Sequence, residues 1–126
     1  MRKVLIIEDD EKIRALLKRL FIKKFRVEVC EAGDGLQGLE VCRTEKPGMI
    51  FLDILMPNMN GIEFLRELRI TDKKTPVVVM TGMRDKELVS QMVLLGITDY
   101  IIKSEIVVHL QSRIAELIYS HEEIFN

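Results

Sequence analysis

Cysteine is scarce in this chain, and its arrangement argues against several kinds of site. Cys30 and Cys42 are the two cysteines among 126 residues, and neither belongs to a Cys-x-x-Cys pair. They form no cluster with His109 or His121, so a metal site built from Cys and His is not expected. Isolated thiols in a chain without a signal peptide indicate a reducing compartment. We therefore expect a cytoplasmic protein whose two thiols lie in the core.

The sequence also lacks a strong net charge, long apolar runs and Pro/Gly-rich tracts. Its formal net charge is −1, which gives no general attraction to nucleic acid. No apolar run approaches the length needed to span a membrane. With 48% apolar residues, the chain is expected to fold as one domain over residues 1–126. We expect no direct binding to nucleic acid or to a membrane.

Basic residues are distributed unevenly along the chain. Nine of the 19 Lys and Arg residues precede residue 27, mostly in KIRALLKRLFIKKFR. We interpret them as the solvent-facing side of an amphipathic helix. A docking surface for an acidic partner is the alternative.

Hydrophobic patterning predicts alternating strands and helices. Apolar runs predict five strands, over residues 3–8, 26–31, 49–53, 76–80 and 100–102. Helical spacing predicts five helices, over residues 11–24, 34–44, 61–69, 84–95 and from about 105 towards 120. This order predicts an α/β fold of the flavodoxin-like, doubly wound type. Its five-stranded parallel sheet, of order 2-1-3-4-5, would carry helices on both faces.

Polar and charged residues follow four of the predicted strands. The first strand is followed by three acids and the third, fourth and fifth by one polar residue each: Glu8, Asp9, Asp10, Asp53, Thr81 and Lys103. In a doubly wound sheet, ligands bind beyond the carboxyl ends of the strands, where the first and third strands part. We therefore expect carboxylates, a hydroxyl and an ammonium at one edge.

This combination of side chains suits phosphoryl transfer. Clustered carboxylates repel one another unless they bind a cation or take up protons, and Mg²⁺ prefers oxygen ligands. A carboxylate such as Asp53 can act as a nucleophile and become an aspartyl phosphate. Lys103 can then pair with the phosphoryl group or with Asp53, and Thr81 can donate a hydrogen bond to a phosphoryl oxygen.

Each of these residues also has a purely structural interpretation. An acidic run after a strand often caps the next helix, which we expect to explain Asp10 and Glu11. Asp53 could be a turn residue, Thr81 could open a loop and Lys103 could be solvated. Their joint occurrence at the ends of four strands favours the functional interpretation.

Four segments, VLIIEDDEKIR, FLDILMPNMNG, VVVMTG and DYIIK, resemble the successive motifs of bacterial response-regulator receiver domains. The resemblance covers essentially the whole chain. It implies that Asp53 is the phosphoacceptor and that Glu8 and Asp9 are the family's acidic pair, a placement that rests on Arg14. It implies Mg²⁺ or Mn²⁺ bound by Asp9, Asp53 and the backbone carbonyl of Leu55, with Glu8 acting through water.

The resemblance also implies roles for residues around the phosphoacceptor. Thr81 matches the switch hydroxyl, Tyr100 the switch aromatic and Lys103 the family's lysine. Pro57 and Gly61 match the turn after the third strand. We expect Gly61 to be needed there because glycine permits unusual φ.

The implied function is a phosphorylation switch in two-component signalling. A sensor histidine kinase or a histidine phosphotransfer protein would donate the phosphoryl group, and the chain would signal through changed protein contacts. It would catalyse only its own phosphorylation and dephosphorylation, so we do not expect an enzyme with an external substrate. The fourth helix, fifth strand and last helix would form the surface for a downstream protein or a second copy of the chain.

The sequence departs from the family pattern at three places. Ser104 follows Lys103 where Pro is usual, which bears on the reach of Lys103, and Ser104 could instead cap the last helix. Gly82 stands where a small Ala is common and is expected to loosen its loop. Bulk near Met92 and after Gly96 is expected to alter the packing of the fourth helix.

Alternative functions remain open at this point. The chain could be a pseudo-receiver that is not phosphorylated, or the excised receiver of a longer DNA-binding regulator. An aspartyl-phosphate phosphatase is disfavoured because Leu55 stands where a second Asp is common. A flavodoxin-like FMN protein is disfavoured because no Gly/Ser/Thr-rich phosphate loop follows the first strand.

Overall fold

Strands and helices alternate along the chain in the computed structural model. It describes all residues except 1–2, 57, 83–84, 104–114, 117 and 119–126. The elements are β1 (Lys3–Ile7), α1 (Glu11–Phe25), β2 (Glu28–Ala32), α2 (Gly35–Glu45), β3 (Met49–Asp53), α3 (Gly61–Thr71), β4 (Val77–Thr81), α4 (Lys86–Leu94) and β5 (Asp99–Ile102). The predicted alternation is confirmed over this range.

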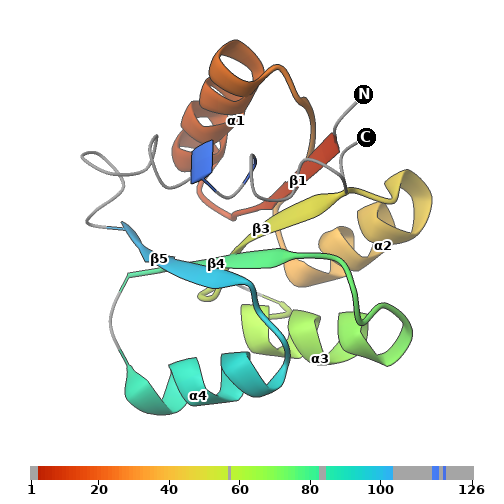
Figure 1. Ribbon diagram of the computed structural model, residues 1–126, viewed down its shortest axis with the longest axis vertical. Coiled ribbons are helices and arrows are strands. Elements are labelled where there is room, and N and C mark those ends of the chain that lie inside the picture. Colours follow the sequence, from red (N-terminus) through yellow and green to blue (C-terminus); the bar gives the residue numbers. More distant parts are fainter. Residues whose placement is uncertain (1–2, 57, 83–84, 104–114, 117, 119–126) are drawn as a thin grey trace.

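The five strands form one parallel sheet of order β2-β1-β3-β4-β5, as predicted. Figure 1 shows α1 on one face of the sheet and α2, α3 and α4 on the other. Because all strands run in the same direction, their carboxyl ends lie at one edge. The order places β1 beside β3, and the loops that follow these two strands lead to helices on opposite faces.

The helix count differs from the prediction of five. Four helices, α1 to α4, are assigned within the described residues. The predicted last helix, from about 105 towards 120, lies largely outside that range, although Ala115, Glu116 and Ile118 are helical. None of the helices in the described part is both long and apolar enough to cross a membrane.

The strands are apolar on both faces because each face carries helices. Ile6 of β1 packs in a cluster with Phe21 of α1, whereas Ile7 packs in a second cluster with Phe64 of α3. Phe21 also meets Phe51 of β3 with ring centroids 4.8 Å apart. This double burial explains why the inner strands read as continuous apolar runs.

Element ends follow from local capping chemistry. Arg26 adopts a left-handed conformation, with φ 52°, and ends α1. The second strand therefore begins at Glu28, two residues later than position 26, where the alternation placed its start. Its alternating pattern suits the position of β2 at the edge of the sheet.

Both thiols lie partly buried against the core, where they were expected. Burial raises the pKa of Cys30, and it raises the pKa of Cys42 to about 12. Both therefore stay protonated at neutral pH, which makes them poor nucleophiles and poor metal ligands.

Glycine at position 61 is required by a close approach, and not by an unusual φ as expected. Gly61 begins α3 directly beside the end of β3, and its N–H donates to the carbonyl of Ile54 at 2.9 Å. A Cβ atom at Gly61 would lie 2.8 Å from Ile54 Cα and 2.9 Å from the carbonyl oxygen of Asp53. Only glycine lets the helix start this close to the strand.

Replacing Gly61 with Ala is expected to destabilise the fold by roughly 1–3 kcal/mol, because backbone atoms must move to admit the methyl group. Gly82→Ala is the matched control, since a Cβ there would meet nothing within 4 Å. That control is expected to change stability by less than about 1 kcal/mol, in the stabilising direction. Urea denaturation of both variants measures the difference, and equal midpoints would contradict the steric explanation.

Candidate functional site

Three buried polar or charged side chains gather at the carboxyl edge of the sheet. Glu8, Asp53 and Thr81 are 0%, 2% and 2% exposed, and they are the buried polar or charged residues of the described chain. Glu8 follows β1, Asp53 ends β3 and Thr81 ends β4. Unpaired charges are rarely buried, so their concentration at one edge marks a functional site and not a random part of the core.

Lys103 brings the fifth strand into this site. Its Nζ lies 2.8 Å from Glu8 Oε1 and 3.2 Å from Asp53 Oδ2. Pairing with Asp53 was predicted, whereas the shorter contact with Glu8 was not. The reach of Lys103, which the following Ser104 had put in question, is sufficient for both carboxylates. Ser104 itself lies outside the described residues.

The electrostatic environment of Glu8 favours its protonated form. Burial, together with the hydrogen bond and the charge of Asp53, raises the pKa of Glu8 to about 8, although Lys103 acts in the opposite direction. For Lys103, burial disfavours the ammonium, but its interactions with Glu8 and Asp53 prevail and raise its pKa. One ammonium therefore does not fully compensate two buried carboxylates.

Asp9 adds a third, exposed carboxylate to the site. One carboxylate oxygen from each of Glu8, Asp9 and Asp53 lies within 4.8 Å of the other two. When Glu8 is ionised, its buried Oε2 accepts no hydrogen bond from the described residues. An all-oxygen donor set with an unsatisfied buried oxygen and excess negative charge fits a hard divalent cation. The predicted acidic pair and Asp53 are thus brought together.

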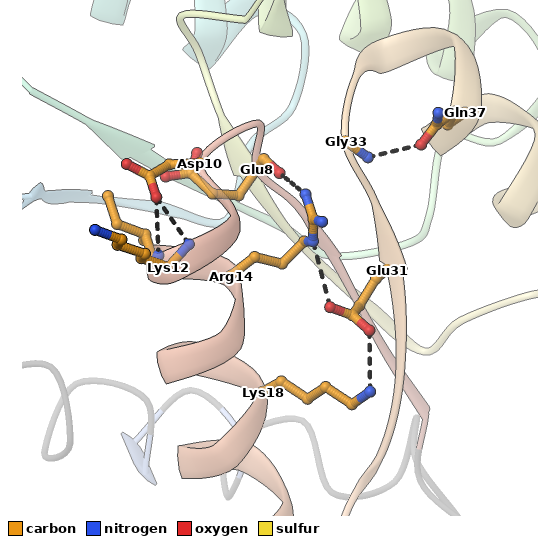
Figure 2. Close-up of polar contacts among 9 residues, drawn as sticks. Glu8, Asp10, Lys12, Arg14, Lys18, Glu31, Gly33 and Gln37 are labelled. Atoms are coloured by element: carbon orange, nitrogen blue, oxygen red, sulfur yellow. Dashed lines mark hydrogen bonds and ion pairs between the residues drawn. The ribbon is translucent and has the colours of Figure 1, made fainter.

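Asp10 does not belong to this group, as predicted. It is the N-cap of α1, and its Oδ1 accepts hydrogen bonds from the N–H groups of Lys12 at 2.9 Å and Ile13 at 3.2 Å (Figure 2). The first turn of α1 carries Glu11, whose charge suits the helix dipole. Asp9 therefore belongs to the carboxylate group of the site, whereas Asp10 caps α1.

The loop from β3 to α3 is ordered by its own side chains. The N–H of Leu55 lies 3.4 Å from Asp53 Oδ1, while the Leu55 side chain is 62% exposed. Asn60 caps α3 and exchanges hydrogen bonds with Glu63 in a capping box. Asn58 adopts φ 65°. Pro57, which the sequence assigned to this turn, lies outside the described residues, and the metal-binding role of the Leu55 carbonyl stays a prediction.

Thr81 and Tyr100 lie on the adjacent strands β4 and β5. Thr81 is buried at the carboxyl end of β4, and Tyr100 is partly buried against the core cluster beneath α2, α3 and α4. The positions of Thr81 and Tyr100 suit the predicted pair of switch residues, whose roles stay predictions.

On α4, Met92 is fully buried, so the fold accommodates the extra bulk at this position.

In the sequence, Arg14 served only to place the acidic pair, whereas the structure shows which groups its side chain contacts. Its Nη1 donates to the backbone carbonyl of Glu8 at 2.6 Å, and its Nε lies 3.3 Å from Glu31 Oε1 (Figure 2). Lys18 also pairs with Glu31, at 3.0 Å. The spacing of Arg14 from the acids hinted at a link, but its partner on β2 depends on the fold.

The raised pKa of Glu8 predicts how metal-free protein responds to pH. Folded protein keeps the Glu8 proton up to about pH 8, whereas the unfolded chain loses it near 4.5. Between these values the folded state binds more protons, so its stability should fall as pH rises, by up to about 5 kcal/mol over the whole range. Urea denaturation in EDTA across this range measures the slope.

Glu8→Gln should flatten that pH dependence, because the amide does not titrate. Glu67→Gln, at an exposed position of α3, should leave it intact. A slope that persists unchanged in Glu8→Gln would assign the proton to another group.

Comparison with known proteins agrees with this geometry. The family model described as "Response regulator receiver domain" matches residues 4–115. The probable C4-dicarboxylate response regulator DctR of Bacillus subtilis is 37% identical over 102 residues, covering 80% of this chain and 45% of its own length. The chain thus spans less than half of that relative.

Two further proteins match over most of their length. Sporulation initiation phosphotransferase F of Bacillus subtilis is 33% identical over 94 residues, covering 75% of each chain. The crystal structure of the response regulator domain of Thermotoga maritima CheB superposes with a TM-score of 0.81 at 27% identity, covering 100% of this chain and 97% of that one. The chain therefore belongs to the response regulator receiver domain family.

Proposed function

We propose that this chain is a phosphorylation switch that accepts a phosphoryl group on Asp53. The observation that carries the proposal is the position of this carboxylate. Asp53 is buried at the end of β3, 3.2 Å from the Lys103 ammonium and grouped with the carboxylates of Glu8 and Asp9. A nucleophilic carboxylate held beside a cation and a cation-binding acid pair is the arrangement that phosphoryl transfer to aspartate requires.

The chain's own residues divide the chemistry among them. An Asp53 oxygen attacks the phosphorus of a phosphohistidine, and an O–P bond forms as the P–N bond to the donor imidazole breaks. The Lys103 ammonium, already beside this oxygen, pairs with the negative phosphoryl group. Bound Mg²⁺, held by Asp9 and Asp53 with Glu8 nearby, would neutralise phosphoryl charge.

The acyl phosphate then changes the balance between two conformations. Thr81, at the end of the neighbouring strand, donates a hydrogen bond from its hydroxyl to a phosphoryl oxygen, and Tyr100 is biased inward. Hydrolysis of the acyl phosphate resets the state. Under this proposal the chain lies in the cytoplasm and acts on no external metabolite, and its donor is a sensor histidine kinase or a histidine phosphotransfer protein.

Intact-protein mass spectrometry after incubation with acetyl phosphate and Mg²⁺ tests the proposal. We expect one phosphoryl adduct of about 80 Da that is lost in Asp53→Ala and strongly reduced in Asp9→Asn, because these remove the nucleophile and a metal ligand. Asp10→Asn is the matched control: Asn caps a helix as well as Asp, so labelling should persist.

A labelled Asp53→Ala variant would exclude Asp53 as the acceptor. If neither acetyl phosphate nor a histidine kinase phosphorylates the wild-type chain, the pseudo-receiver alternative replaces this proposal. Loss of labelling in Asp10→Asn would mean that Asp10 belongs to the metal site.

The output surface that we propose includes α4. Three apolar residues of this region turn largely inward, since Met92 is buried and Leu88 and Leu95 are partly buried against the core. Val93 and Leu94 instead project outwards, with 61% and 87% of their surfaces exposed. Two adjacent exposed apolar residues favour a partner or a second copy of the chain at this face.

Self-association through α4 predicts a concentration-dependent dimer after phosphorylation. Leu94→Glu should abolish it, because a charge at a buried interface position is costly, while Leu36→Glu, at an exposed apolar position of α2, should not. Analytical ultracentrifugation with and without acetyl phosphate measures both variants. A wild-type protein that stays monomeric in both states would exclude self-association and leave a different protein as the partner.

A further inference from the structure

We propose that residues Gly33, Asp34 and Gly35, between β2 and the start of α2, brace against each other the β1–α1 loop and the β3–α3 loop, which begin at the acidic side chains of the site. Arg14 and Asn58 are the positioning residues that tie these loops to the brace. The inference rests on the proposed metal site formed by the β1–α1 and β3–α3 loops, but the brace itself supplies none of its ligands.

The first connection joins the β1–α1 loop to the strand that leads into the brace. Arg14 Nη1 donates to the Glu8 carbonyl at 2.6 Å (Figure 2), and the N–H of Glu8 donates to the carbonyl of Ala32 at 3.0 Å. Arg14 Nε also reaches Glu31 on β2 at 3.3 Å. A Cβ at Gly33 would lie 3.5 Å from Arg14 Nη1, so the guanidinium lies against the brace.

The second connection joins the brace to the β3–α3 loop. Asn58 Nδ2 donates to Asp34 Oδ2 at 3.1 Å, and the N–H of Gly35 donates to the carbonyl of Met59 at 3.2 Å. A Cβ at Gly35 would lie 2.7 Å from that same carbonyl oxygen. The brace therefore touches the β3–α3 loop at Gly35, where only glycine fits.

Asp34 is occupied in a way that suits bracing and not metal binding. Its Oδ1 accepts from the N–H of Gln37 at 2.9 Å and so caps α2, while Oδ2 takes the Asn58 amide. Each carboxylate oxygen has a partner on a different element. The residue thus fixes the β3–α3 loop to the start of a helix that itself packs on β1 and α3.

The brace matters because the acidic side chains of the site come from separate segments of the chain. Glu8 and Asp9 follow β1, whereas Asp53 ends β3, and these three carboxylates lie within 4.8 Å of one another. When they ionise to bind a cation, these carboxylates repel one another, and Mg²⁺ tolerates little variation in ligand distance. Supporting contacts that hold the loops together should therefore act on metal affinity more than on folding.

Two variants break one connection each with little other change. Arg14→Gln removes the guanidinium that reaches the Glu8 carbonyl. Asn58→Gly removes the amide but keeps the backbone, since glycine adopts the left-handed φ of 65° without strain. Lys18→Gln is the control, because Lys18 pairs with the same Glu31, at 3.0 Å, without touching the β1–α1 loop.

The measurement is a Mg²⁺ titration of each full-length variant, followed by ¹H–¹⁵N NMR, with a thermal melt in EDTA alongside. We expect the Mg²⁺ dissociation constant to rise about 3- to 10-fold in each single variant and to change less than about twofold in Lys18→Gln. The double variant, Arg14→Gln with Asn58→Gly, should bind Mg²⁺ no more weakly than the single variant with the lower affinity. The reason is that breaking either connection already frees the loops.

Unchanged Mg²⁺ constants in both single variants would overturn the brace. So would a double variant in which the two effects multiply, since that indicates two independent local effects. The brace would also be overturned if every variant, including Lys18→Gln, bound Mg²⁺ more weakly in proportion to a lower melting temperature. A wild-type chain that binds Mg²⁺ but accepts no phosphoryl group would contradict the proposed function, and the brace would still be tested by the Mg²⁺ dissociation constants. A wild-type chain that binds no Mg²⁺ would overturn the brace.

Discussion

Two buried carboxylates, Glu8 and Asp53, face the single ammonium of Lys103, and the rest of the site depends on this imbalance. The carboxylates sit at the ends of neighbouring strands, β1 and β3, while Lys103 follows β5 and reaches past the end of β4. Removing charges from water costs several kcal/mol per ion unless partners replace the solvent. This arrangement leaves carboxylate charge that a proton or a cation can compensate.

The parallel sheet makes the arrangement possible because it separates stability from chemistry. Strands buried on both faces provide the core, and their apolar residues leave no room for charge until the strands end. At that edge the backbone passes into loops, where polar side chains find both neighbours and solvent. Asp53 is the last residue of β3 and Thr81 the last of β4, so the strand ends themselves place these two side chains at the site.

Loops alone would hold such a site poorly, and side chains without reactive roles provide the missing order. Asp10 caps α1, which follows the β1–α1 loop, and Asn60 caps α3, which follows the β3–α3 loop. Gly61 lets α3 begin against the backbone of β3. The contacts of Arg14 and Asp34 then connect loops that arise from different strands. These contacts form a supporting layer around the acidic residues.

Much of this molecule could be predicted from local sequence. Apolar periodicity identified the strands and the four described helices, and their alternation gave the strand order, because short crossovers of fixed hand leave few topologies. The ends of strands one, three, four and five identified Glu8, Asp9, Asp53, Thr81 and Lys103 as one group. Local capping rules also separated Asp10 from the acids of the site.

Contacts between distant segments were decided only by the tertiary structure. The Lys103–Glu8 pair spans 95 positions, the Arg14–Glu31 pair 17 and the Asn58–Asp34 pair 24, and no periodic pattern encodes such partners. The raised pKa of Glu8 likewise arises from burial beside Asp53, and the need for glycine at position 61 from a neighbouring backbone. Sequence determines which residues reach the edge of the sheet, because periodicity and capping are local. Only packing determines which of them meet, because distance, burial and charge depend on the whole fold.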